Sequence, residues 1–101
     1  LPFPPLAAQD LAAIADYIAA DSPVRALSFV RALRTQCQRI TLNPPGYRLR
    51  PALGDRIRSC AHGHHVIFFE SNSDVVVIVR ILHGARDIPA VFGADPESPL
   101  R

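Results

Sequence analysis

The sequence contains no lysine, and all 11 of its basic residues are arginine. A catalytic site that depends on a lysine is therefore excluded, whereas the planar guanidinium of arginine suits two-pronged contacts with carboxylates and phosphates. Because the chain is also rich in alanine and proline, the base composition of its gene is the alternative explanation of the arginine bias. The formal net charge is only +2, which does not favour non-specific binding of nucleic acid through bulk charge.

Cysteine is scarce, and long apolar runs are absent. Neither Cys37 nor Cys60 stands in a metal-ligand spacing, and free thiols are the default in a cytosolic protein. No stretch approaches the roughly 20 apolar residues of a membrane helix. The opening residues, LPFPPLAAQD, lack the basic start and the apolar core of a signal peptide. We therefore expect a cytoplasmic protein with no membrane contact, no metal centre and no cofactor.

The length of 101 residues predicts one domain, and 49% hydrophobic with 20% charged residues is typical of a globular chain. We expect this domain to span residues 1–92. Residues 93–101 are polar and rich in proline, and they predict a flexible tail.

The first half of the chain predicts two helices. Residues 1–5 favour at most a short edge strand, because their prolines cannot donate to a ladder. Residues 5–20 have apolar side chains at helical spacing, which places Asp10 and Asp16 towards water. Ser22 and Pro23 are a typical cap and first residue of a second helix, which the residues NPPG at 43–46 end. The short connection between the helices predicts an antiparallel hairpin.

The second half predicts strands at residues 56–61, 65–70 and 75–82, after a loop at 47–55. Turns at 62–64 and 71–74 make them an antiparallel meander. The expected fold class is therefore α+β: a short N-terminal strand, an antiparallel helical hairpin, and a three-stranded antiparallel β-meander with the hairpin on one face.

The run VRILHGARD places charges at the end of the most apolar strand. Strict alternation would put Arg80 on the face of Leu82, opposite Val79 and Ile81. An arginine within an apolar strand needs water or a carboxylate, and Asp87 is the expected partner. The group of Arg80, His83, Arg86 and Asp87 has three interpretations: a structural clamp at the strand end, a contact for a partner, or a catalytic site.

Two further clusters also allow more than one interpretation. His62, His64 and His65 crowd one turn, but they lack the additional ligands of a closed zinc site, so exposed turn histidines are the simpler interpretation. A role in RNA cleavage for one of them is the minor alternative. A second basic cluster consists of Arg48, Arg50, Arg56 and Arg58. It suits contact with an acidic partner or with a nucleic-acid backbone. The alternative is that these arginines only form a solvated surface.

Three segments in order carry a family resemblance: AAQDLAAIADYIA, RIRSCAHGHHVIFF and VRILHGARD. Together they resemble the ParE branch of the RelE/ParE toxin superfamily over roughly residues 4–92. The resemblance implies the toxin half of a type II toxin–antitoxin pair, which a ParD-like antitoxin neutralises in a heterotetramer or larger complex. Toxins of this branch generally act on DNA gyrase by stalling the cleaved DNA complex and arresting growth.

On this first hypothesis the protein acts by binding, so no residue is catalytic and sequence-specific binding of nucleic acid by the toxin alone is not expected. The residues expected to contact the target or the antitoxin are Arg48, Arg50, Arg58, Arg80, His83, Arg86 and Asp87.

The same superfamily contains RelE-type enzymes that cut messenger RNA on the ribosome, and this is the alternative. Such an enzyme would use Arg58, Arg80, His83 and Arg86, because phosphodiester cleavage needs proton transfer and cations. The absent lysine, and tyrosines only at positions 17 and 47, favour the ParE branch. A third hypothesis is a non-toxic member that acts only as a binding module.

Overall fold

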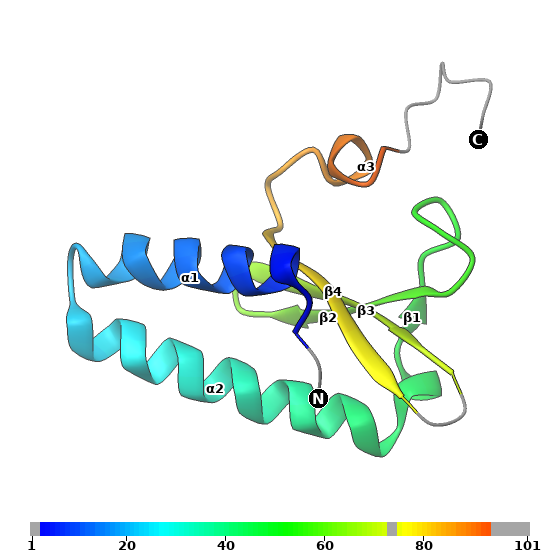
Figure 1. The fold of residues 1–101 in the computed structure, drawn as a ribbon, viewed down its shortest axis with the longest axis horizontal. Coiled ribbons are helices and arrows are strands. Elements are labelled where there is room, and N and C mark those ends of the chain that lie inside the picture. Colours follow the sequence, from blue (N-terminus) through cyan, green and yellow to red (C-terminus); the bar gives the residue numbers. More distant parts are fainter. Residues whose placement is uncertain (1–2, 73–74, 94–101) are drawn as a thin grey trace.

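The computed structural model describes residues 3–72 and 75–93, which fold as a helical hairpin packed on an antiparallel sheet (Figure 1). The α+β architecture and the hairpin are as predicted. The elements in chain order are α1 (Pro5–Ala19), α2 (Pro23–Leu42), the 3₁₀ turn η1 (Pro44–Gly46), β1 (Arg48–Leu49), β2 (Ile57–His62), β3 (His65–Ser71), β4 (Val76–His83) and α3 (Ile88–Val91). The tail expected at 93–101 lies outside the described residues except for Gly93.

Each helix of the hairpin begins with a proline. Proline lacks a backbone N–H, but the N–H groups of the first turn have no partner within the helix, so no hydrogen bond is lost. Ser22 caps α2 as predicted, since its hydroxyl accepts a hydrogen bond of 3.2 Å from the Arg25 N–H. Figure 1 shows the joined end of the two helices projecting beyond the sheet. The distal half of the hairpin therefore has no strand beneath it.

The sheet has four strands in the order β1-β2-β3-β4, all antiparallel. The additional strand is β1, which pairs Arg48 with Ser59 inside the segment that we expected to be a loop. An N-terminal strand is not confirmed, because Phe3 and Pro4 precede α1 without joining the sheet and residues 1–2 lie outside the described part.

A bulge interrupts the pairing of β3 with β4. Phe68 pairs with Arg80 but Phe69 pairs with Ile78, so Val79 is an extra residue on β4. As a result Val79 packs in the same cluster as Leu82, and Ile81 packs in the other. The expectation that Val79 and Ile81 share a face is therefore wrong, because strict alternation fails at a bulge.

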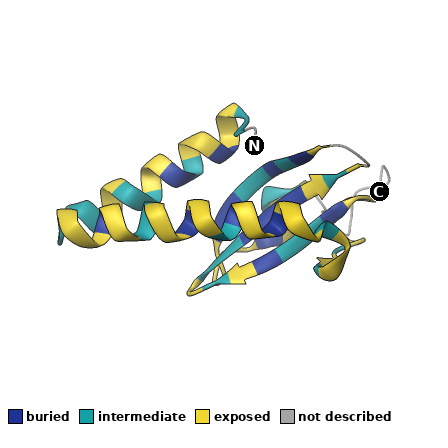
Figure 2. Ribbon diagram, turned by 90° about the horizontal axis from the view of Figure 1, so that it is seen from below, coloured by how far each residue is buried: buried dark blue, intermediate teal, exposed yellow. Residues whose placement is uncertain are grey.

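The sheet carries an apolar cluster on each face. The larger cluster lies between the sheet and the hairpin and includes Leu11, Leu33, Cys37, Ile67 and Phe69. The smaller one lies on the opposite face, where α3 and the segment before β2 cover Phe68 and Leu82. In Figure 2 buried residues gather where the helices overlap the sheet, whereas the joined end of the hairpin is mostly exposed or intermediate. Within the described residues, no helix has the length and apolar character to cross a membrane.

Candidate functional site

A groove of about 560 Å³ opens between the projecting half of the hairpin and the nearby end of the sheet. Its size is within the range of sites that bind ligands or partner side chains. One wall is helical, and the other is formed by the β2–β3 turn and the end of β4. The lining residues are Ala13, Ile14, Tyr17, Ile18, Arg25, Phe29, His62, Gly63, His64, His65 and His83.

Strand pairing brings the histidines to this wall. Cross-strand partners share a face of a sheet. One row of partners that faces the core is Cys60–Ile67–Ile81. The row on the same face that is two positions nearer the β2–β3 turn is His62–His65–His83. The tight turn between β2 and β3, in which Gly63 adopts a φ of 60°, fixes this register.

All four histidines of the chain contact one another or the hairpin at this point. The His65 ring stands edge-to-face against Phe29 with centroids 5.3 Å apart, and His62 does the same at 5.8 Å. His83 lies 5.2 Å from His65 and is stacked with His64 at 6.2 Å. Burial, and then its histidine neighbours, lower the pKa of His65. The turn histidines were expected to be exposed, but only His64 is, because His62 and His65 are half-buried against Phe29.

Arg80 forms the principal clamp of the fold, but with Asp10 and not with Asp87. Its Nε and Nη2 donate to the two Asp10 oxygens at 2.7 and 2.8 Å, and the Ile81 N–H donates to the same carboxylate at 2.9 Å. The hydrogen bonds that Arg80 donates to Asp10 raise the pKa of the Arg80 guanidinium. The expectation that Asp10 faces water is wrong, because α1 packs along β4 and turns this residue onto the open edge of the sheet.

Asp87 caps α3 instead, where its Oδ1 accepts from the Ala90 N–H at 3.4 Å. His83 is exposed, and its Nδ1 accepts a hydrogen bond of 3.0 Å from the Ala85 N–H, which leaves Nε2 as the donor of the neutral ring. The Arg86 side chain is exposed and, within the described part of the chain, has no hydrogen bond or ion pair.

The arginines around β1 and β2 are held mainly by the backbone and by aromatic contacts. Arg58 donates to the Tyr47 carbonyl at 2.7 Å. The Arg50 guanidinium lies 5.7 Å above the Phe68 ring and donates to the Ser59 hydroxyl at 3.4 Å. Arg48 is exposed on β1. The structure therefore does not gather the seven predicted contact residues into one site; only His83 among them lines the groove.

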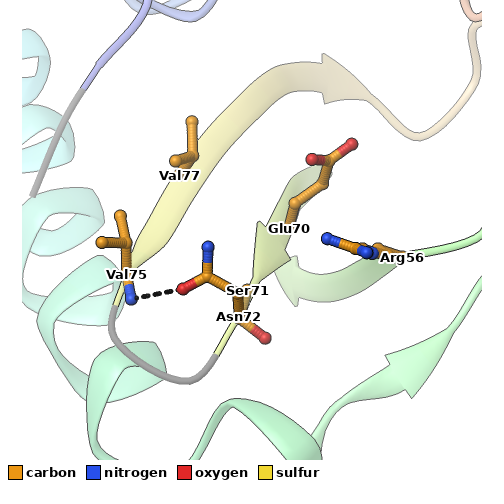
Figure 3. Close-up of a pocket in the computed structure, with 6 residues that line it drawn as sticks. All are labelled: Arg56, Glu70, Ser71, Asn72, Val75 and Val77. Carbon is orange, nitrogen blue, oxygen red and sulfur yellow. Dashed lines mark hydrogen bonds between the residues drawn. The ribbon is translucent and has the colours of Figure 1, made fainter.

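Neither the cysteines nor the small pocket beside Arg56 adds a reactive centre. Burial raises the pKa of the Cys37 thiol to about 11 and also raises that of Cys60, so both thiols stay protonated and inert. No group of three or more His, Cys, Asp or Glu side chains among the described residues could hold a metal ion. The pocket beside Arg56 and Glu70 in Figure 3 has a volume of about 50 Å³, which is room for little more than water.

Sequence reasoning missed the helical wall of the groove, namely Ile14, Tyr17, Ile18, Arg25 and Phe29. Tyr17 is 84% exposed, which helical periodicity alone did not indicate. One available signal was the alternation of the strand that begins at His65, since it places His65 on the same face as Ile67 and Phe69.

Comparison with known proteins gives one result. A family model described as "ParE toxin of type II toxin-antitoxin system, parDE" matches residues 1–88. No curated protein matches the sequence.

Proposed function

This chain belongs to the family of ParE toxins of parDE type II toxin–antitoxin systems, and we propose that it is a gyrase-directed toxin neutralised by a ParD-like antitoxin. It acts in the cytoplasm by binding gyrase and stalling the cleaved DNA complex, which arrests growth. The antitoxin holds it in a heterotetramer or a larger assembly until release.

The family match carries this proposal, because it covers all four strands and both long helices. The open groove supports it, since an apolar depression on so small a domain is typical of a surface that another protein covers. Tyr17 at this groove is largely exposed, and Val24 and Leu27 are further exposed apolar side chains of the hairpin.

The geometry favours a binding role over ribonuclease chemistry. RNA cleavage needs a proton acceptor, a proton donor and uncommitted cations around one phosphate. Of the arginines that the alternative requires, Arg80 is neutralised by Asp10 and Arg58 is bound to backbone carbonyls. His83 and Arg86 lie near each other at the end of β4, away from β1.

Two assays on the purified toxin test the proposal. We expect inhibition of gyrase supercoiling with accumulation of cleaved DNA, and we expect messenger RNA on translating ribosomes to remain intact. Adding the antitoxin should restore supercoiling.

Cleavage of messenger RNA with unaffected gyrase would replace the proposal with the RelE-type alternative. No effect in either assay, and no growth arrest on expression, would leave a binding module without toxicity.

A further inference from the structure

The histidine wall of the groove is a concentration of titratable groups that the proposed gyrase activity does not use. His62, His65 and His83 form one row across three strands, and His64 stacks on the last of them. His64 is exposed, and among the described residues neither of its ring nitrogens has a hydrogen-bond partner. In His83, Nδ1 is already bonded to the Ala85 N–H, so Nε2 is the nitrogen that a partner can reach.

The facing wall supplies apolar contacts and one fixed positive charge. Ile14, Ile18 and Phe29 line its base, and Tyr17 stands at its rim. Arg25 adds a permanent charge from α2. Of the titratable groups on α1, Tyr17 lines the groove, whereas Asp10 pairs with Arg80 and Asp16 is exposed outside the groove lining. Asp21 lines the adjoining hollow beside Tyr17 and Arg25.

No aspartate or glutamate lines the groove itself within the described part of the chain. The groove therefore presents an apolar base with one arginine and four imidazoles, and nothing negative to neutralise them. A partner without carboxylates would bury the imidazole N–H donors and the Arg25 cation with no acceptor. Burying such groups unpaired costs free energy of binding. Charge complementarity thus calls for an occupant that carries acidic side chains.

A metal ion does not explain the cluster. The His64 and His83 rings are nearly parallel, at 10°, so their nitrogens do not converge on one point. Nδ1 of His83 is already an acceptor for Ala85.

We propose that this groove receives a segment of the antitoxin that lays apolar side chains on α1 and α2 and places one carboxylate against His64 and another against the Nε2–H of His83, so that His64 takes up a proton on binding and the affinity rises as pH falls. This inference rests on the proposed function, since it assigns the place and the chemistry of antitoxin binding. A carboxylate beside an imidazole favours the charged ring, and linkage requires that proton uptake on binding raises affinity at lower pH. Histidine is the side chain whose charge changes between about pH 5 and 8, so the response falls in a physiological range.

The test compares the affinity of the toxin for the antitoxin of its own module at pH 7.5 and pH 6.0, at constant ionic strength. For the unmodified toxin we expect the dissociation constant to fall about threefold to tenfold, as the uptake of about one proton predicts. His64→Gln removes the imidazole at an exposed position and should cut that change to less than about twofold.

Arg25→Gln is the matched control, because it removes a fixed charge from the same groove. It should weaken binding at both pH values by a similar factor and leave the pH-dependent change in place. Circular dichroism of each variant checks that the fold is retained.

The outcomes separate the two proposals. A complex whose affinity is independent of pH, or weaker at pH 6.0, would overturn the histidine inference and leave the toxin–antitoxin proposal standing. A pH-dependent change that persists in His64→Gln would overturn it in the same way. If no complex forms at either pH, the proposal that the antitoxin binds this toxin is contradicted, and the histidine inference is contradicted with it.

Discussion

At the scale of single residues, the decisive contact is between Asp10 and Arg80. The Asp10 carboxylate accepts three hydrogen bonds, two from the guanidinium and one from the Ile81 N–H. Because Ile81 lies on the edge strand β4, this carboxylate also satisfies a backbone donor that the sheet leaves unpaired. One side chain thus joins α1 to the sheet and protects the open edge.

We predict that Asp10→Ala destabilises the fold by about 3 kcal/mol. The two side chains are 18% and 11% exposed, so the loss should be near the lower end of the range for breaking a buried pair. Adding Arg80→Leu should recover at least about 1 kcal/mol, because it removes the charge left unpaired. Urea unfolding measures both. Asp16→Ala, at an exposed position of the same helix, is the control and should change stability by less than about 0.5 kcal/mol.

The sequence showed that Arg80 needs a carboxylate but pointed to the wrong one. Asp87 is near in sequence, whereas Asp10 lies 70 positions away and is brought close only by packing of α1 on β4. Helical periodicity predicted that Asp10 faces solvent, because the pattern identifies a single apolar face of the helix as buried. A helix at the edge of a sheet has a second contact line, which the pattern of its own residues does not reveal.

At the scale of elements, the hairpin positions the groove. Ser22 ends the connection between the helices and caps α2 next to Arg25, so the cap holds together the part of the hairpin that projects beyond the sheet. The sheet beneath the distal half is absent, so local interactions must maintain the angle of entry into α2.

We predict that Ser22→Ala lowers the stability of the protein by about 1 kcal/mol, because the Arg25 N–H loses its acceptor. Thermal or urea unfolding measures the change. Ser28→Ala is the same substitution at an exposed position within α2, and alanine has the higher helix propensity, so it should be neutral or slightly stabilising. Equal effects of the two substitutions would contradict a capping role.

The helices, the meander and their order could be predicted from the sequence, because periodicity, caps and turns are local signals. The register of β3 and β4 could not. Strands that end at Glu70 and begin at Val75 imply that Arg80 stands opposite His65, but the longer β3 and the bulge at Val79 place His83 there. The convergence of the histidines therefore depends on a bulge, which leaves no mark in an all-apolar run.

At the scale of the whole molecule, the histidine cluster has opposite consequences for the free and the bound toxin. Burial and histidine neighbours lower the pKa of His65 in the folded chain, so the folded state binds fewer protons there than the unfolded state. This contribution to stability is fully present above the pKa of an unfolded histidine, 6.5, and is lost as pH falls through the folded value. Acid should loosen the free toxin and strengthen the complex.

We predict that the urea midpoint of the free toxin falls between pH 7.5 and pH 5.5, and that His65→Asn reduces this fall. Most carboxylates remain ionised in this range, so histidine dominates the change in bound protons. His65 also packs on Phe29, so the variant should be less stable at both values, and the slope with pH is therefore the readout. An equal fall in the variant and the unmodified protein would show that acid acts elsewhere. A smaller fall in the variant would identify His65 as a principal site at which acid weakens the free toxin.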